Sequence, residues 1–184
     1  MEKINTETKC NLCDISIECH WTPGRGRGYS HTVMYLLPSP TKSDYKNGIC
    51  TSRNTKKIQQ FNDEYNFLAY YTTLVKCVTK ETPRRVELDN CRTRFQKELF
   101  EVSPKIIITI GDIVTSEILE YKYFKDVVDK PHILTINNQK VIIYPIYHPS
   151  YVDKEQITEI YNKSFVTIAK LYKAFINPNY LIIP

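Results

Sequence analysis

The chain has 184 residues, of which 42% are hydrophobic. This length predicts a single domain over residues 1–184, because it is too short for two domains that each bury a substantial core. Lys and Arg number 25 against 20 Asp and Glu, and the formal charge of +5 permits a polyanionic partner without requiring one. The first ten residues lack the apolar core of a signal peptide, and the longest aliphatic run, Ile106 to Ile110, is too short to span a bilayer, so we expect a soluble intracellular protein of the cytoplasm or nucleoid without a membrane partner.

The N-terminal segment combines closely spaced cysteines with a glycine-rich stretch. Cys10 and Cys13 form a C-x-x-C pair before any recognisable strand or helix, and Cys19 follows. Disulfides are rare in reducing compartments, so metal ligation is the first interpretation of this spacing, with a redox pair as the alternative. The next stretch, WTPGRGRGY, predicts a flexible loop that can bring Arg25 and Arg27 against an anion, although a solvated loop fits equally well.

The first strand is predicted over residues 31–37, HTVMYLL, and it runs directly into the turn sequence PSPT. A parallel strand that ends in such a turn presents the turn at the carboxyl edge of its sheet, where ligands bind. Residues 42–55 are polar and rich in turn formers, and they predict a long loop. A short helix is predicted over residues 56–67.

A second strand is predicted over residues 69–77, AYYTTLVKC, which are rich in β-branched and aromatic side chains. Residues 84–102 predict an amphipathic helix, because its apolar residues recur at intervals of three and four: Leu88, Cys91, Phe95, Leu99 and Val102. The opposite face of this helix carries four arginines. We interpret them as a solvated helix face rather than a binding patch.

The remainder of the chain alternates strands and helices. A strand is predicted over residues 105–110 and a helix over residues 113–120, with a Gly-Asp turn between them. A buried strand follows at residues 141–146 and a long helix at residues 153–175, whose apolar residues lie on one side. This alternation predicts an α/β protein, a three-layer α/β/α sandwich with a central parallel sheet.

His148 is the residue that the pattern itself singles out for chemistry. The strand before it stops at His148-Pro149, because proline bars further ladder pairing. An imidazole is therefore held at the carboxyl edge of the predicted sheet, where open α/β folds bind ligands. A lone His-Pro more often caps a turn, so the meaning of this histidine depends on the rest of the chain.

The cysteines supply a second pattern, a set of four thiols from three segments: Cys10, Cys13, Cys77 and Cys91. Such a set can hold zinc or an iron–sulfur cluster. The fourteen-residue step from Cys77 to Cys91 is wider than the C-x-x-C pair of a zinc ribbon, and this favours a cluster.

These features together resemble the family 4 uracil-DNA glycosylases, the iron–sulfur branch of that superfamily. The family shows a C-x-x-C pair, a glycine loop, strands ending in GEAPG-type and TNVVKC motifs, a helix cysteine, a strand followed by LG, and HPS or HPA. The matching stretches, in the same order and covering nearly all of the chain, are CNLC, PGRGRG, VMYLLPSP, YTTLVKC, Cys91, PKIIITIG and YHPSY. The resemblance implies a uracil-DNA glycosylase-like fold with a [4Fe–4S] cluster held by Cys10, Cys13, Cys77 and Cys91.

The same resemblance implies that the protein binds DNA and hydrolyses the N-glycosidic bond of a uracil or related base that has been flipped from the duplex. His148 matches the family's histidine that stabilises the leaving base, and Ser39 lies where the attacking water is oriented. The positions that match base contacts are Thr73, Pro40 and Gly48. The residues assigned to DNA contacts are Arg25, Arg27, Ser150, Tyr151 and Val152.

The chain departs from the family's motifs at several of these positions. Pro38 replaces the carboxylate that acts on the attacking water, and Ser39 stands where relatives place aspartate, asparagine or alanine. Thr73 replaces the asparagine that reads the uracil edge and offers one hydroxyl in place of an amide. The phenylalanine expected to stack on the base shortly after Gly48 is absent.

Two functions follow from these matches and departures. One is a divergent DNA glycosylase that uses His148 with a water held by Ser39. The alternative is a catalytically silent DNA-binding or replication-associated subunit that keeps the fold and the cluster, and an electron-transfer protein is a weaker third. The expected partners of this monomer are single- or double-stranded DNA and a replication or repair protein. The abundance of Lys, Ile, Asn and Tyr is typical of an AT-rich genome such as a viral one.

Overall fold

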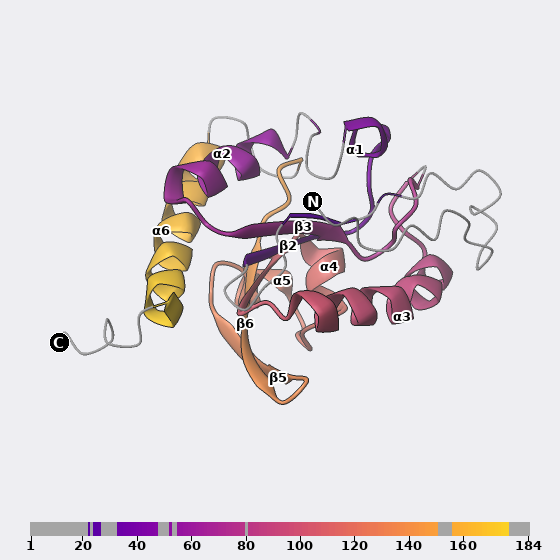
Figure 1. The fold of residues 1–184 in the computed structure, drawn as a ribbon. Helices are drawn as coiled ribbons and strands as arrows, with labels where there is room; N and C mark the ends of the chain where they lie inside the picture. Colours follow the sequence, from indigo (N-terminus) through magenta and orange to yellow (C-terminus); the bar gives the residue numbers. More distant parts are fainter. Residues whose placement is uncertain are drawn as a thin grey trace.

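The structure is a computed structural model that describes residues 22, 24–26, 33–47, 52, 55–79, 81–150 and 156–176. Figure 1 shows the elements in chain order. The strands are β1 (Arg25–Gly26), β2 (Val33–Leu37), β3 (Ala69–Thr73), β4 (Ile106–Ile110), β5 (His132–Ile136) and β6 (Gln139–Ile146). The helices are α1 (Lys42–Asn47), α2 (Lys56–Tyr65), α3 (Arg85–Val102), α4 (Asp112–Ser116), α5 (Phe124–Val127) and α6 (Ile157–Ile176).

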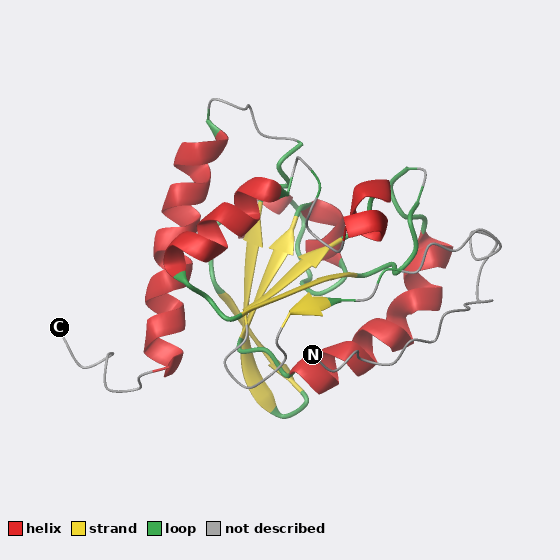
Figure 2. Cartoon of the chain, turned by 45° about the horizontal axis from the view of Figure 1, so that its top comes forward, coloured by secondary structure: helices red, strands yellow, loops and turns green. Residues whose placement is uncertain are grey.

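The strands form one sheet in the order β1-β3-β2-β4-β6-β5. The four central strands are parallel, and their registers place Leu37 beside Thr73 and Ile110 beside Ile146. The carboxyl ends of these strands therefore meet at one edge of the sheet, seen as the fan of arrowheads in Figure 2. The predicted parallel sheet is confirmed at its centre, but β1 and β5 are antiparallel edge strands, so the sheet as a whole is mixed.

Helices cover both faces of this sheet (Figure 2), which confirms the three-layer α/β/α sandwich. One core packs β2, β4 and β6 against α2 and α6, and at its centre the Phe61 and Phe165 rings stack with centroids 4.9 Å apart. The other core packs the opposite face of the same strands against α3 and α4. Complete burial of a side chain such as Phe165 stabilises the fold by about 1.5–3 kcal/mol relative to leaving it in water.

The helix α1 lies in a segment predicted as a loop, so that prediction is wrong. Thr41 and Asp44 explain the helix: the Thr41 backbone N–H donates to Asp44 Oδ2 at 2.8 Å, and the Asp44 backbone N–H donates to Thr41 Oγ1 at 3.2 Å. This reciprocal pair is a capping box with aspartate in place of the usual glutamate, and it satisfies amides that a helix start leaves unpaired.

Three further expectations need correction. The second strand ends at Thr73 rather than at Cys77, because Leu74 and Val75 turn to donate backbone hydrogen bonds to the carbonyls of Leu37 and Pro38. Arg25, predicted in a loop, lies in β1. The stretch before β6, where no helix or strand was predicted, contains α5 and β5.

The other predicted elements are confirmed with small shifts of their ends: β2, β4 and β6 among the strands, and α2, α3, α4 and α6 among the helices. None of the helices in the described part of the chain has the length and apolar character that crossing a membrane requires.

Candidate active site at the carboxyl edge of the sheet

The predicted chemical residues that the structure describes gather at the edge where the parallel strands end. Ser39 and Pro40 follow β2, and Thr73 is the last residue of β3. His148 lies two residues beyond the end of β6. Because β3, β2, β4 and β6 are consecutive neighbours, these residues come from strands that share one edge.

His148 is held by the residue two positions later. Its Nδ1 lies 2.6 Å from Ser150 Oγ and accepts a hydrogen bond from the Ser150 backbone N–H at 3.2 Å. A backbone N–H can only donate, so Nδ1 is the acceptor nitrogen of the neutral ring. The proton of neutral His148 is therefore assigned to Nε2, which makes Nε2 the hydrogen-bond donor of this side chain.

Burial lowers the pKa of His148 below its ordinary value of 6.5. The neutral imidazole is consequently the main form at neutral pH. This form can donate one hydrogen bond from Nε2 without bringing a positive charge into the site.

Gly111, the residue after β4, forms the backbone surface against which His148 packs. Its φ of +92° disfavours any side chain, and a Cβ built at this position would lie 3.1 Å from His148 Cβ. The Gly111 N–H also donates to the Ile146 carbonyl at 2.9 Å, which joins the ends of β4 and β6. The glycine thus allows the imidazole to lie over the end of the neighbouring strand.

Thr73 differs from the other buried threonines of the site region. Its side chain is 1% exposed, and its Oγ1 has no hydrogen-bond partner among the residues that the structure describes. An unsatisfied buried hydroxyl costs about 1–3 kcal/mol. A ligand that donates to this oxygen or accepts from it removes that cost, so Thr73 is placed as a ligand-binding group would be.

The sheet fixes the span between Thr73 and His148. β3 and β6 are separated by β2 and β4, which makes three interstrand steps of about 4.8 Å, or about 14 Å between the two strands. Thr73 and His148 therefore lie on opposite sides of the two central strands at this edge of the sheet.

Ser39 is part of a short chain of hydroxyl groups. Its Oγ lies 2.8 Å from Thr79 Oγ1, and Thr79 Oγ1 donates to the Glu81 backbone carbonyl at 2.6 Å. Ser39 is thus tied to the segment that follows β3, and its side chain has a defined orientation.

The residues assigned to DNA contacts are only partly described. Arg25 is exposed on the edge strand β1 opposite Tyr71, and Ser150 is exposed beside His148. The remaining predicted contacts to base or DNA lie outside the described residues: Gly48, Arg27, Tyr151 and Val152.

Two of the four predicted metal ligands are described, and both are buried. Cys77 is 2% exposed and lies four residues beyond β3, and Cys91 is 3% exposed on the inward face of α3. Cys10 and Cys13 lie outside the described residues. Within the described part of the chain no group of three or more Cys, His, Asp or Glu forms a metal site, as expected when half of the predicted set is not included.

Further observations bear on whether these cysteines fit a cluster. The Thr22 N–H donates to the Lys76 carbonyl at 2.9 Å, so the chain just after Cys19 enters the fold beside the residue that precedes Cys77. Cys77 is disulfide-bonded in the structure, whereas Cys91 is a reduced thiol. Buried sulfur donors beside the N-terminal segment match the thiolate chemistry that an iron–sulfur cluster requires.

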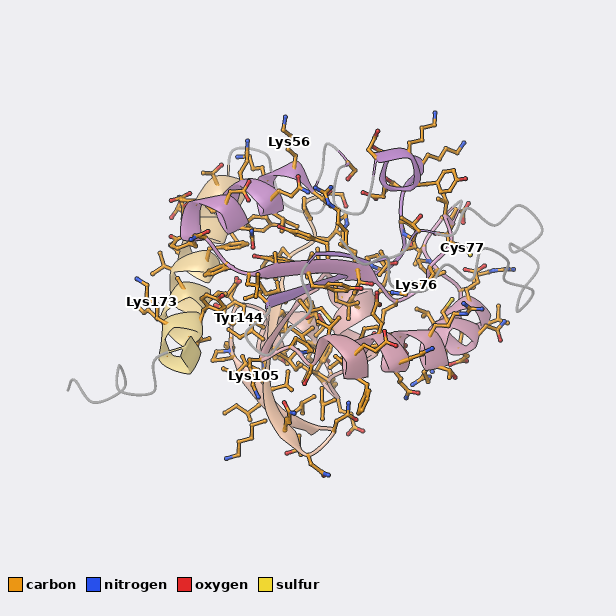
Figure 3. All side chains as sticks on the ribbon, in the orientation of Figure 1. Lys56, Lys76, Cys77, Lys105, Tyr144 and Lys173 are labelled. Atoms are coloured by element: carbon orange, nitrogen blue, oxygen red, sulfur yellow. The ribbon has the colours of Figure 1, made fainter. Side chains whose placement is uncertain are left out.

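A buried polar cluster braces the two elements that carry these cysteines. Glu98 on α3 accepts hydrogen bonds from Tyr70 and Thr72 of β3, each at 2.7 Å, and forms an ion pair with Lys76. Burial and the Glu98 carboxylate raise the pKa of Tyr70, so its phenol remains a donor. Figure 3 shows Lys76 and Cys77 near α3. The cluster of Tyr70, Thr72, Lys76 and Glu98 holds the end of β3 against the helix.

The exposed face of α3 carries ion pairs, as the prediction of a solvated face requires. Arg85 pairs with Asp89 at 2.9 Å and with Glu117 at 2.6 Å, and Arg92 pairs with the same two carboxylates at 3.1 Å. Arg84 pairs with Glu87 at 2.8 Å. These guanidinium groups are directed to acidic neighbours.

Two residues of this region were not predicted from the sequence, Thr79 and Glu98, and Gly111 was predicted only as part of the turn after its strand. The glycine had a signal, because it directly follows the aliphatic run of β4 and precedes a helix. Thr79 and Glu98 have no local pattern that separates them from other surface residues. Their roles depend on contacts with Ser39 and Lys76, which the fold alone creates.

Comparison with known proteins agrees with this arrangement. The family model of the uracil DNA glycosylase superfamily matches residues 36–170, which include the ends of all four parallel strands. The chain is also 23% identical over 164 residues to a Type-4 uracil-DNA glycosylase from Sulfurisphaera tokodaii. That match covers 82% of this chain and 74% of the relative.

Proposed function

The chain belongs to the uracil-DNA glycosylase superfamily, and from this premise we propose that it binds DNA and hydrolyses the N-glycosidic bond of a flipped uracil or related base. The observation that carries the proposal is the pairing of two groups across the edge of the sheet. His148 is oriented by Ser150 at one end, and the unsatisfied hydroxyl of Thr73 lies at the other. A base between them would receive polar contacts from both sides.

His148 acts on the leaving group in this proposal. When the bond between C1′ and the base breaks, negative charge develops on the ring, including its carbonyl oxygens. A neutral imidazole that donates from Nε2 stabilises this charge more in the transition state than in the bound substrate. Loss of one such donor typically costs about 10²–10³-fold in rate.

Thr73 contacts the base edge in this proposal. Its hydroxyl can either donate to a ring carbonyl or accept from a ring N–H, whereas an asparagine amide does both at once. Thr73 therefore distinguishes bases less sharply than the asparagine of the family motif. We expect the protein to accept related bases beside uracil, with Pro40 and Gly48 completing the pocket.

The DNA backbone is assigned to the positive and polar groups near the same edge. These are Arg25, Arg27 and Ser150, with Tyr151 and Val152 in the loop that enters the DNA. Phosphate contacts of this kind release counterions, so affinity should fall steeply with salt. Flipping costs a few kcal/mol of lost stacking, which contacts in the pocket offset.

A [4Fe–4S] cluster on Cys10, Cys13, Cys77 and Cys91 is the proposed cofactor. When bound, it cross-links the N-terminal segment, the chain after β3 and helix α3, and supplies structural rigidity. A cysteine in a disulfide cannot ligate iron at the same time, so this proposal requires Cys77 as a thiolate. Anaerobic purification with iron and sulfide analysis tests this. Cys91→Ser should lose iron, whereas the control Cys50→Ser should retain it.

The excision proposal is tested with purified protein on uracil-containing single- and double-stranded oligonucleotides. Alkali-labile abasic product should form with the wild-type chain and fall about 10²–10³-fold with His148→Ala. Oligonucleotides with other deaminated or damaged bases test the breadth of recognition. Equal product from both proteins on every base would contradict excision.

A second candidate is a DNA-binding subunit that does not excise bases, and Pro38 is the observation that favours it. Proline stands where the family motif carries a carboxylate, and its side chain can neither bind nor polarise a water. Fluorescence anisotropy over a salt series separates the two functions. Salt-dependent DNA affinity without abasic product supports the silent subunit, and absence of DNA binding excludes both.

A further inference from the structure

The hydroxyl groups of Ser39 and Thr79 form an ordered pair whose direction the structure determines. Ser39 Oγ and Thr79 Oγ1 are 2.8 Å apart, and from that distance alone either group can be the donor. Thr79 Oγ1 also lies 2.6 Å from the backbone carbonyl of Glu81. A carbonyl oxygen can only accept, so the single hydroxyl hydrogen of Thr79 is used in that bond.

The hydrogen of Ser39 is therefore donated to Thr79. A hydroxyl has one hydrogen and two lone pairs, and this assignment leaves Ser39 Oγ with both lone pairs for other donors. Toward any other hydrogen-bonding group, such as a water molecule, Ser39 Oγ is then an acceptor. The polarity of this serine is set by a residue forty positions later in the chain.

The backbone explains why Thr79 reaches Ser39. The Leu74 N–H donates to the Leu37 carbonyl at 2.9 Å, and the Val75 N–H donates to the Pro38 carbonyl at 3.0 Å. The chain leaving β3 thus runs beside the turn that follows β2. Thr79 lies further along the same segment, and both hydroxyls are partly buried.

We propose that Thr79 is a positioning residue that makes Ser39 an acceptor for the attacking water. This inference rests on the proposed excision function and deepens it. A water that donates one hydrogen to Ser39 Oγ directs a lone pair toward the sugar C1′. If Ser39 donated instead, that lone pair would be engaged and the water would be a poorer nucleophile.

The reaction balances without a net proton on Ser39. The water oxygen forms a bond to C1′ as the C1′–N bond breaks, and the bonding electron pair leaves with the base. One water hydrogen remains on the new sugar hydroxyl, and the other ends on the departed base through solvent. Ser39 thereby replaces the orienting role of the missing carboxylate, and it does not act as a base.

Two substitutions at residue 79 separate orientation from packing. Thr79→Val keeps the shape and removes the hydroxyl, whereas Thr79→Ser keeps the hydroxyl. In single-turnover assays, Thr79→Val should slow excision about 10-fold, the effect of losing one hydrogen bond, and Thr79→Ser should remain within about 2-fold of wild type. Affinity for an oligonucleotide with uncleavable 2′-fluoro-deoxyuridine should be unchanged in both variants.

A double mutant gives the sharper result. Thr79→Val added to Ser39→Ala should cause no further loss, because Thr79 acts through Ser39. Three results would each overturn the inference. Thr79→Val could excise at the wild-type rate, both Thr79 variants could be slowed equally, or the losses from Thr79→Val and Ser39→Ala could add in the double mutant.

A neutron crystal structure after deuterium exchange tests the same inference without reference to activity. Deuterium on Ser39 Oγ that points to Thr79 supports the assignment, and deuterium that points into the site overturns it. If the wild-type chain excises no base while the deuterium points to Thr79, the proposed function fails and the hydrogen-bond direction stands.

Discussion

Thr72 and Thr73 are neighbours on β3, yet their buried hydroxyl groups have opposite surroundings. Thr72 Oγ1 donates to Glu98 and accepts from Lys76, on the face of the sheet that packs against α3. Thr73 points to the other face and has no partner among the described residues. The comparison separates two states of a buried polar group: the hydroxyl of Thr72 is satisfied and links β3 to α3, whereas the hydroxyl of Thr73 is unsatisfied among the described residues.

The largest expected effect comes from breaking the satisfied cluster. Glu98→Ala leaves the buried Lys76 without its counterion and should lower the free energy of unfolding by about 3–5 kcal/mol in urea denaturation. Glu101→Ala, an exposed change on the same helix, should stay within about 0.5 kcal/mol. The double substitution Lys76→Met with Glu98→Leu removes both buried charges but leaves the Tyr70 and Thr72 hydroxyls without their acceptor, so it should recover only part of the loss. A double variant no more stable than Glu98→Ala would show that the unpaired Lys76 charge is not the main cost.

The next effect concerns the opposite side of the comparison, the active edge. His148→Ala should reduce single-turnover excision about 10²–10³-fold while changing the free energy of unfolding by less than about 1 kcal/mol. Ser150→Ala keeps the backbone hydrogen bond to Nδ1 and should cost about 10-fold or less. If His148→Ala lowered the free energy of unfolding by as much as it raised the free-energy barrier to excision, this histidine would be structural.

The two threonines themselves give the most direct test. Thr72→Val removes hydrogen bonds to charged groups and should destabilise the protein by about 1.5–3 kcal/mol. Thr73→Val removes an unsatisfied hydroxyl and should raise stability by about 1 kcal/mol while weakening base recognition. Urea denaturation and excision assays on the Thr72→Val and Thr73→Val variants measure these two effects. Destabilisation by Thr73→Val would show that the Thr73 hydroxyl has a structural partner.

The smallest effect is a pH dependence. Because burial lowers the pKa of folded His148 below 6.5, the unfolded chain binds a proton first as the pH falls through 6.5. The contribution of His148 to stability is therefore present above 6.5 and declines as the pH falls toward the folded pKa. An NMR titration of the imidazole should give a midpoint below 6.5 in the folded protein, and urea-unfolded chain is the control. A folded midpoint above 6.5 would contradict the assignment.

Much of the fold could be predicted from the sequence, because buried elements impose clear patterns. Continuous apolar runs indicate the strands β2, β4 and β6. Apolar residues spaced at intervals of three and four indicate the helix α3. β5 is different, since it is an edge strand whose Ile133 is 67% exposed. The hairpin turn at Asn137 and Asn138, both with positive φ, was the available signal.

A site residue could be predicted only where the residues next to it in the sequence indicate its position in the fold. His148 stands at a strand end followed by proline, and that position is visible in the sequence. The unsatisfied state of Thr73 and the pairing of Ser39 with Thr79 arise from tertiary contacts. No local pattern contains them, because strand length, turn direction and neighbouring loops must be known first.

Gly111 shows how a residue without a side chain can determine where a neighbouring side chain lies. With a φ of +92° and a would-be Cβ only 3.1 Å from His148, nearly every replacement would strain the backbone and displace the imidazole together. A random mutagenesis screen for inactive variants should consequently recover position 111 alongside position 148. Residue 73 is also buried, so only side chains of similar size to threonine are expected to fit there, whereas position 111 should accept no residue other than glycine.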